Sequence, residues 1–333
     1  MEIRDIDLND DAQLHTAYAI EQRARRVGRE QMPHWTREEF CGAMRTPDSG
    51  ERQYMRAAYE GETMVGFSVT WHPLLDNTEK CWGEISVDPP VVRRGAGSAL
   101  LDDIEATAAA NDRTMVIIVS RVPADQRDTH PYSLFAQTRG YSLGNLEIVR
   151  HLSLPVPEER ISGWIESAAT AHEGYEIVTF ADEFPEHLAE SLCLLLGQLA
   201  ADAPTGSIDF EEEVISPERL ADRYATAAAM GRSIYETVAL APDGVVAAQS
   251  TLAVSKGESP HVFQWGTFVH REHRGHRLGL ATKAANLLAV QRAHPDKNLV
   301  TTQNAEDNGY MVAINEQMGF EPVEAALEWC KTI

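Results

Sequence analysis

One pattern occurs twice in this sequence, and the two copies lie about half a chain length apart. Each copy runs from a Trp-Gly pair through a short apolar stretch into a turn rich in arginine and glycine, and then into a longer apolar segment. When Val87 is aligned with Val269, Gly97 falls on Gly279. Repeats in solenoid proteins are only about 20–50 residues long. The wide spacing therefore indicates a duplicated domain rather than a solenoid.

The chain length agrees with this duplication. At ~150 residues per domain, a chain of 333 residues is expected to form about two domains. Each copy is followed by a predicted helix that ends in glycine and an aromatic residue, at Gly140-Tyr141 and at Gly319-Phe320. Prolines and charged residues between 154 and 160 mark the end of the first domain. We expect an N-terminal domain at 1–155, a linker at 156–171 and a C-terminal domain at 172–333.

Hydrophobic periodicity predicts the same order of elements in both domains. An early helix is expected in each domain, at 11–26 and 184–201. Strands are expected at 54–58, 65–71 and 84–87 and at 233–239, 245–254 and 262–269. Beyond each turn we expect a long helix and then a buried strand, at 98–111 and 114–119 and at 280–293 and 298–302. The predicted fold class is mixed α/β, formed twice.

The charge of the chain limits its partners. It has 51 Asp and Glu against 29 Lys and Arg, which gives a net charge of −22. Such a surface repels nucleic acids and anionic membranes, and it attracts a small cationic molecule or a basic peptide. Solubility alone explains the acidic excess equally well. We expect neither a nucleic-acid partner nor a membrane partner.

The N-terminus lacks the pattern of a signal peptide, and the longest apolar run, at 192–196, is far shorter than the ~18 residues of a membrane helix. The four cysteines are widely scattered and form no CxxC pair. They indicate reduced thiols rather than a disulfide framework or a metal site. We therefore expect a cytoplasmic protein without a metal centre.

The turn of the second copy is a basic island in an acidic chain. Residues 270–277 hold three arginines, three histidines and one glutamate, directly before a predicted helix. Free amides at a helix start, together with arginine side chains, favour an anionic ligand such as a phosphate. A solvent-facing loop with a glycine cap is the alternative. Histidines at every third position also suggest a metal, but the interleaved arginines favour a phosphate-facing or exposed loop. The chain has neither a P-loop motif nor a dinucleotide-binding glycine motif at a first strand.

Both turns resemble the pyrophosphate loop of the GCN5-related N-acetyltransferase (GNAT) superfamily. The matching segments are Arg93-Arg94-Gly95-Ala96-Gly97 and the run from Arg274 to Gly279, and the later helix from Asn308 to Phe320 resembles a second motif of the family. The tandem arrangement is similar to that of mycothiol synthase and related actinobacterial acetyltransferases. The resemblance implies two tandem GNAT-like domains, each a mixed, mostly antiparallel sheet flanked by helices. It also implies direct transfer of an acetyl group from acetyl-CoA to the primary amine of a small, cationic metabolite.

The resemblance also implies which residues bind acetyl-CoA. In the second copy these are the strand end, the loop, the helix start and two later asparagines: Phe268, Val269, His270, Arg274, Gly275, His276, Arg277, Leu278, Gly279, Leu280, Ala281, Asn304 and Asn308. In the first copy the corresponding residues are Val87, Arg93, Arg94, Gly95, Gly97 and Ser98. As an alternative, each asparagine is a normal cap of a strand end or helix start.

Neither copy keeps the family pattern completely. Val92 stands where the first loop should begin with glutamine or arginine, and Arg277 replaces the first glycine of the second loop. The tyrosine that serves the family as general acid is replaced by Ala136 in the first copy and by Asn315 in the second. Tyr310 is a candidate substitute, although a tyrosine at such a position more often serves packing.

The remaining catalytic candidates are acidic. Glu84 precedes the first loop on its strand, where a carboxylate would face the cleft and act as general base. Asp202 follows an early helix and is a candidate for holding the substrate amine, although the Pro and Gly beside it fit an ordinary turn. We favour catalysis in the second domain, with the first binding coenzyme idly or serving as a scaffold. The alternative is a catalytically silent acyl-CoA-binding sensor, and either protein would be a monomer or a homodimer.

Overall fold

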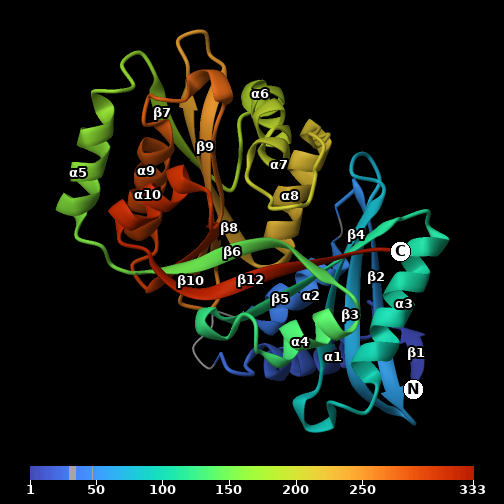
Figure 1. The fold of residues 1–333 in the computed structure, drawn as a ribbon. Helices are drawn as coiled ribbons and strands as arrows, with labels where there is room; N and C mark the ends of the chain where they lie inside the picture. The colour runs from blue at the N-terminus through green and yellow to red at the C-terminus, as the bar shows by residue number, and fades with distance from the viewer. Residues whose placement is uncertain (30–34, 47) are drawn as a thin grey trace. The chain divides into compact units, whose positions relative to one another are not determined.

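The structure is a computed structural model that describes residues 1–29, 35–46 and 48–333. The chain forms two compact units. The first unit contains Met1–Ile148, Thr205–Phe210 and Glu324–Ile333, and the second contains Val149–Pro204 and Glu211–Val323. Both chain termini therefore belong to the first unit (Figure 1).

The first unit is built on a mixed, mostly antiparallel sheet in the order β1-β2-β3-β4-β5-β12. Its strands are β1 (Glu2–Asp5), β2 (Glu51–Glu60), β3 (Thr63–Pro73), β4 (Lys80–Val87), β5 (Met115–Pro123) and β12 (Glu321–Thr332). Neighbouring strands run antiparallel except for β4 and β5, which are parallel. The chain leaves this unit along β6 (Ser142–Ser153).

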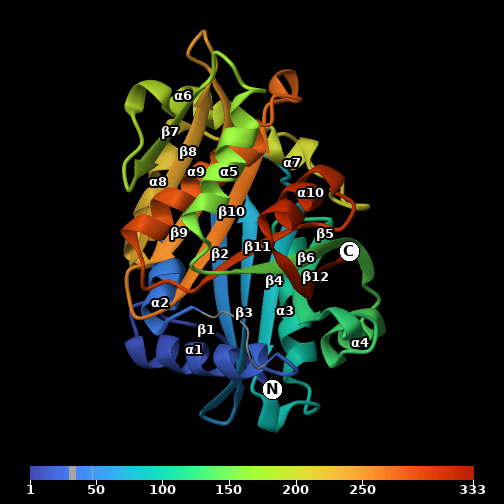
Figure 2. The same cartoon turned by 90° about the vertical axis from the view of Figure 1, so that its left-hand side faces the viewer.

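Helices cover both faces of this sheet. The helices α1 (Asp11–Arg25) and α2 (Arg37–Arg45) lie on one face and α3 (Ala96–Ala110) lies on the other, as Figures 1 and 2 show. The N-terminal starts of α1 and α2 follow from the sequence. Asp10 caps the start of α1, and a capping box formed by Thr36 and Glu39 begins α2. The short helix α4 (Pro131–Thr138) follows β5 after a 3₁₀ turn, η2 (Ala124–Gln126).

The second unit repeats this plan. Its sheet contains β7 (Glu176–Ala181), β8 (Arg232–Leu240), β9 (Val246–Ser255), β10 (His261–Val269) and β11 (Leu299–Ala305), in the order β11-β10-β9-β8-β7. The pair β10–β11 is parallel, and the pairs β10–β9, β9–β8 and β8–β7 are antiparallel. The predicted fold class, two mixed α/β domains with mostly antiparallel sheets, is therefore confirmed.

Six helices described in the second unit lie on the two sides of its sheet. On one side are α5 (Glu158–Ala169), α9 (Leu278–Ala293) and α10 (Gly309–Met318), and on the other are α6 (Glu186–Gly197), α7 (Leu199–Asp202) and α8 (Pro217–Ala229) (Figure 1). The helix α9 supplies the centre of the core with Leu280, Ala284 and Leu287.

The domain limits expected from the sequence differ from these units in several places, among them Val149–Pro155, which belongs to the second unit, and Thr205–Phe210, which belongs to the first. The expected linker at 156–171 forms α5, whose apolar side chains Ile161, Trp164 and Ala168 are buried in the core of the second unit. The last ten residues, Glu324–Ile333, belong to the first unit because they pair with β5. The proline run at 154–160 correctly marks the end of a strand, but it does not separate the helix that follows from the second core.

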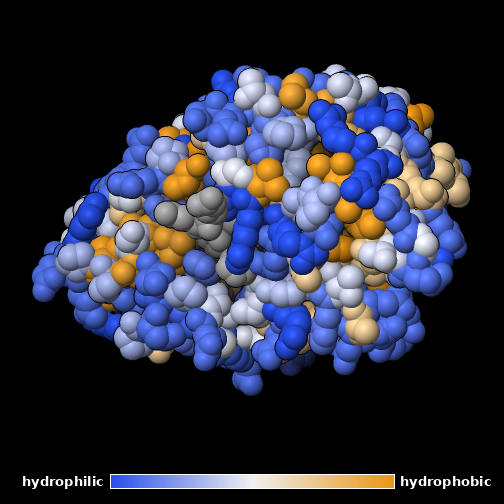
Figure 3. Space-filling view, turned by 90° about the horizontal axis from the view of Figure 1, so that it is seen from below, coloured by the Kyte–Doolittle hydropathy of each residue, from blue (hydrophilic) through white to orange (hydrophobic). Residues whose placement is uncertain are grey.

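Figure 3 shows the residue hydropathy of one face of the molecule. The face shown in Figure 3 consists mainly of hydrophilic residues, and its hydrophobic residues occur in separate small groups. In the part of the chain that the structure describes, none of the helices combines the length and the apolar character needed to cross a bilayer.

Candidate functional site

In each unit, the two neighbouring parallel strands of the sheet are hydrogen-bonded to each other over only part of their length. The strands β10 and β11 pair only from His261 to Phe263, and the later part of β10 separates from its neighbour. The strands β4 and β5 likewise pair only from Lys80 to Gly83. Backbone N–H and C=O groups beyond these points lack a strand partner on that side, and buried groups of this kind need another partner. The end of the central strand is therefore able to bind a ligand in both units.

Only the second unit adds a β-bulge at this position. The pairing of β10 with β9 shifts by one residue between Gln264 and Gly266, so Trp265 is an extra residue in β10. The amide of Gln264 compensates locally, since its Nε2 donates to the carbonyl oxygens of Thr251 and Gly266, both at 2.7 Å. Within the described strands β3 and β4, the register continues without such a shift. Bulges of this kind re-aim side chains and often lie next to active sites.

The loops that follow β4 and β10 have left-handed backbone conformations at the same two positions, but glycine and arginine are exchanged between these positions. In the first loop, Arg93 has φ 67° and Gly95 has φ 98°, and in the second, Gly275 has φ 89° and Arg277 has φ 54°. All four residues are thus in the left-handed region, where glycine is favoured and other residues are uncommon. Turns of this type direct successive N–H groups into a shared concavity that binds anions.

The helices after the loops begin without a side-chain cap. Among the described residues, neither Gly95 at the start of α3 nor Arg277 at the start of α9 provides a capping hydrogen bond. The first backbone bond inside α9 joins the Ala281 N–H to the Arg277 carbonyl at 3.1 Å. The N–H groups that precede Ala281 therefore remain available, and the positive end of the helix dipole lies at the same place. This is the geometry that an anionic group requires.

The helix starts are also packed tightly against their surroundings. A Cβ at Gly279 would lie 3.2 Å from Ile314 and 3.5 Å from Val269, whereas one at Gly97 would lie 3.6 Å from Phe135. These two glycines therefore bring the helix close to the strand and to the next helix. Because neighbouring side chains lie close to the position of a Cβ, neither glycine leaves an empty space beside the helix.

Solved structures resemble this chain over nearly its whole length. A tandem GNAT protein from the clavulanic acid biosynthesis pathway matches with a TM-score of 0.79 and 25% identity, covering 99% of this chain and 98% of that one. A GCN5-related N-acetyltransferase from Sphaerobacter thermophilus matches with a TM-score of 0.66 and 14% identity, covering 99% and 95%. The N-myristoyltransferase of Saccharomyces cerevisiae matches with a TM-score of 0.60 and 12% identity, covering 99% and 80%.

This chain has the tandem GNAT fold. The matches at 14% and 12% identity support the fold alone, whereas the first match also reproduces the tandem arrangement. No protein-family model matches the sequence, and no curated protein matches it closely enough to count as a relative. The roles of individual residues in this GNAT fold therefore depend on the geometry of each site.

The arginines of the second GNAT loop are bound to other residues of their unit. The Asp202 carboxylate accepts hydrogen bonds from Arg271 at 2.9 Å and from Arg274 at 2.6 Å. Arg277 donates to the Ser167 carbonyl at 2.7 Å. Asp202, expected to hold the substrate amine, thus neutralises two loop arginines and is only 15% exposed. The sequence could not show this pairing, because about seventy positions separate the partners.

The histidines of this loop are likewise engaged locally. His270 accepts from the Glu272 N–H at 3.2 Å, His273 shares a hydrogen bond of 2.9 Å with the Tyr175 hydroxyl, and His276 lies 3.0 Å from the Ala171 carbonyl. Among the described residues, no group of three or more His, Cys, Asp or Glu side chains is placed to hold a metal ion.

The other residues of the second unit that were predicted to bind coenzyme are buried or half-buried apolar side chains. Phe268, Leu278, Leu280 and Ala281 are buried in apolar clusters, so only their backbones face the loop. Val269 is half-buried beside Leu278. In the first unit, Val87 is half-buried against an apolar cluster that contains Ala96 and Leu100, and Ser98 is half-buried at the start of α3.

The first GNAT loop has a more open set of cations. Arg94 lies 3.7 Å from Glu60 in a weak ion pair. Arg93 is exposed, and no residue in the described part of the chain forms an ion pair with it. Arg93 and Arg94 are therefore less constrained by ion pairs than Arg271 and Arg274 of the second loop, which Asp202 holds although they are also half exposed.

Of the two asparagines predicted to contact the coenzyme, Asn304 belongs to a buried hydrogen-bond network of the second unit, together with Asn315. Asn315 is fully buried, accepts a hydrogen bond from the Lys283 ammonium and donates to Asn304 at 2.9 Å. Arg150 also donates to the Asn304 carbonyl oxygen at 3.1 Å. Asn308 instead caps α10 by accepting from the Met311 N–H. Because both groups of the Asn315 amide are engaged, this side chain is not available as an acid.

The sequence did not indicate a role for Lys283, because its neighbours on the same helix are mostly apolar residues of the core. Burial, with a further contribution from Arg150, lowers the pKa of Lys283 to about 7. Its ammonium also lies 4.7 Å from the centre of the Phe320 ring. Lys283 is therefore a buried lysine that belongs to the hydrogen-bond network of Asn315 and Asn304.

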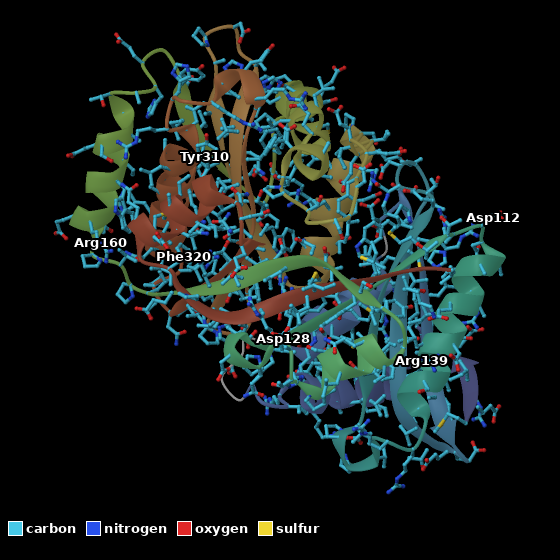
Figure 4. All side chains as sticks on the ribbon, in the orientation of Figure 1. Asp112, Asp128, Arg139, Arg160, Tyr310 and Phe320 are labelled. Atoms are coloured by element: carbon cyan, nitrogen blue, oxygen red, sulfur yellow. The ribbon has the colours of Figure 1, made fainter. Side chains whose placement is uncertain are left out.

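The remaining predicted catalytic residues are Tyr310 in the second unit and Glu84 in the first. Tyr310 is 90% exposed at the start of α10, toward the other end of that helix from Phe320 (Figure 4). In the first unit, Glu84 is held by Arg25 at 2.8 Å, and Ala136 is buried. An exposed tyrosine and an ion-paired glutamate are both weak candidates for proton transfer.

A segment from later in the chain covers β4 in the first unit. Phe210 stacks on Trp82 with the ring centres 5.8 Å apart, and the Lys80 ammonium lies 5.5 Å from the Phe210 ring. The preceding turn is fixed to β6, because the Ser207 N–H donates to the Gly144 carbonyl at 2.8 Å. Trp82 and Glu84 point to the same side of β4, since side chains alternate along a strand. The side of the strand that carries Glu84 is therefore partly occupied by Phe210.

Proposed function

We propose that this protein is an acetyl-CoA-dependent N-acetyltransferase whose catalytic centre lies in the second unit. The reaction is direct transfer of the acetyl group to the primary amine of a small cationic metabolite. The observation that carries the proposal is the combination, in one unit, of the bulge at Trp265, the separation of β10 from β11 and the uncapped start of α9. The first unit shares the last two features and lacks the bulge among its described strands.

The residues of the second unit fit the coenzyme. The pyrophosphate would bind the N–H groups of Gly279 and Leu280 and of the left-handed loop at Gly275, where the fold leaves amides without protein partners among the described residues. The end of β10 stays paired with β9, and the His270 N–H donates to the Ala247 carbonyl at 2.9 Å, so only the backbone groups on its other side, where β11 has separated, would hold the pantetheine arm, with Asn304 beside them. When bound, the thioester supplies an activated acetyl group, and the backbone donors at the bulge would stabilise negative charge on its oxygen.

The first unit supports a binding or scaffold role. Its loop has the left-handed backbone and the exposed arginines that suit a pyrophosphate. Its β4 face, however, carries Phe210 against Trp82, and its glutamate is held by Arg25. An acceptor amine would therefore meet an aromatic side chain of the protein itself.

The substrate class follows from charge. With a net charge of −22, the molecule attracts cations and so raises the encounter rate with a polyamine or a basic amino acid. Lysine, agmatine and spermidine are suitable probes, because each carries a primary ammonium group.

The test uses two matched glycine variants of the full chain. Gly275 and Gly95 both have positive φ and open space around the missing Cβ, so valine at either position strains the loop without a clash. We expect Gly275→Val to abolish thiol release from acetyl-CoA in the presence of the amine probes, and Gly95→Val to leave it within about twofold of wild type. Loss of turnover in Gly95→Val alone would place catalysis in the first unit. Tight coenzyme binding by calorimetry without turnover on any amine would favour the silent acyl-CoA sensor.

A further inference from the structure

The second unit contains a buried carboxylate that the sequence did not single out. Glu236, in the middle of β8, is 2% exposed. Its partner in the described chain is the Thr251 hydroxyl, which lies 2.8 and 3.0 Å from its two oxygens. One hydroxyl can donate only one hydrogen bond, whereas a carboxylate accepts about four. Glu236 is thus left short of donors, which is costly for a buried charge.

The position of Glu236 in the sheet places it on the side of α6 and α8. Its neighbours two residues away on the same face are Ile234, which packs with Ala227 of α8, and Val238, which packs with Leu192 of α6. The carboxylate therefore lies between the sheet and these two helices, on the opposite side from α9 and the proposed pyrophosphate site.

A single row of paired residues links this carboxylate to the bulge. Glu236 pairs with Thr251 on β9, and Thr251 pairs with Gly266 on β10, the first residue after Trp265. Two strand spacings of about 4.8 Å put Glu236 about 10 Å from Gly266 along this row. Gly266 adds no side chain to the row, and a Cβ there would stand 3.3 Å from the Gln249 amide. The carboxylate and the bulge thus face a common region bordered by polar groups.

The groups that surround Glu236 include one further buried polar atom without a partner in the described chain. The Tyr224 hydroxyl is buried and has no hydrogen-bond partner within the described part of the chain. Arg223 stacks over the Trp265 ring at 5.4 Å and is close enough to influence Glu236 electrostatically. From α6 the same face receives Cys193, whose pKa is raised by burial, so it is a neutral thiol at pH 7. On β7, the residue opposite Glu236 is Phe180, which carries no charge.

We propose that Glu236 binds the ammonium group of the acceptor and accepts its proton, with Tyr224 and Thr251 completing the amine site. This inference depends on the proposed function, because the amine must meet the thioester at the bulge. One proton passes from the ammonium to Glu236, and the neutral nitrogen forms the C–N bond to the acetyl carbon as the C–S bond breaks. The second proton of the nitrogen passes to the coenzyme sulfur, and Glu236 then releases its proton to solvent. The overall change is ammonium ion plus thioester to amide plus thiol, with one proton released.

The electrostatics of the site fit this role. Burial raises the pKa of Glu236 to about 7, against opposing effects of Arg223 and the Thr251 hydroxyl. A base with a pKa near the working pH is well matched to proton transfer. The ionised form predominates above about pH 7, so activity should rise with pH through that value.

The test compares Glu236→Gln with a matched control in the full-length protein. Glu328 on β12 of the first unit is also a largely buried strand glutamate, with one donor, Asn145, and a pKa raised by burial. We expect Glu236→Gln to lower kcat/KM for the best amine probe by about 10²-fold or more and to lose the rise in rate near pH 7. Glu328→Gln should keep both. Calorimetry without acetyl-CoA should show weaker amine binding for Glu236→Gln, and calorimetry with acetyl-CoA should show unchanged coenzyme binding.

A second variant keeps the assignment falsifiable if glutamine alters the fold. Thr251→Val removes the hydrogen bond that lowers the Glu236 pKa, so the pH at which the rate rises should move to a higher value, and amine binding should weaken because Thr251 is part of the proposed amine site. Wild-type turnover together with an unchanged rate and pH profile in Glu236→Gln would overturn the role of Glu236 and leave the transferase proposal intact. Absence of turnover by wild type with every amine would overturn both.

Discussion

Arg277 holds in the second loop the left-handed backbone position that Gly95 holds in the first, with φ 54° and 98°. The exchange is reciprocal, since Arg93 and Gly275 occupy the other left-handed position of the two loops. A non-glycine residue in this region is strained by about 1 kcal/mol. The fold thus keeps the loop shape and accepts strain at a different residue in each unit.

The first prediction concerns that strain. Arg277→Gly should be more stable than Arg277→Ala by about 1 kcal/mol, because both lose the hydrogen bond to Ser167 and only alanine keeps a Cβ at positive φ. Urea unfolding of the two variants measures the difference. Equal stabilities would show that residue 277 adopts an ordinary conformation in solution.

The second prediction concerns the glycines at the helix starts. Gly97→Ala should stabilise the protein by about 0.5–1 kcal/mol, because alanine favours the helix and its Cβ would find ordinary contacts at 3.6 Å. Gly279→Ala should gain less or lose stability, since its Cβ would lie 3.2 Å from Ile314. Thermal unfolding of both variants ranks them, and the reverse order would contradict the packing described for α9.

The third prediction separates two roles for Asp202. If it holds loop arginines, Asp202→Asn should free Arg274 for the pyrophosphate, while Arg271 keeps its ion pair with Glu212, and acetyl-CoA binding should strengthen several-fold at low salt. The change in stability should stay within about 1 kcal/mol, because both arginines are half exposed. Calorimetry at low and high salt gives the affinities. A raised KM for the amine with unchanged coenzyme affinity would instead support a substrate-holding role.

The fourth prediction concerns Lys283, whose pKa is lowered from 10.5 to about 7 by burial. Between these two values the unfolded chain binds a proton that the folded protein does not bind, so the stability contributed by this site rises with pH from about 7 to about 10. The free energy of unfolding of wild type relative to Lys283→Met should therefore increase between pH 6.5 and pH 9.5. A difference independent of pH would mean that Lys283 stays charged in the folded protein.

The local parts of this structure could be predicted from the sequence. The duplicated motif identified the two loops, and periodicity placed α3, α9 and the central strands near their observed limits. Such features depend on backbone preferences and on side-chain alternation within about ten to fifteen neighbouring residues. The left-handed loops follow in the same way, because Gly95 and Gly275 are the residues that accept positive φ most easily.

The tertiary structure alone decided which distant side chains meet. It joins Asp202 to the arginines of a loop about seventy positions later, Lys283 to Asn315, and the C-terminal strand to β5 of the first unit. It also places Glu236, an unremarkable residue in an apolar strand, in one row with the bulge at Trp265. Such contacts depend on strand register and on packing across the whole fold, and no short stretch of sequence contains that information.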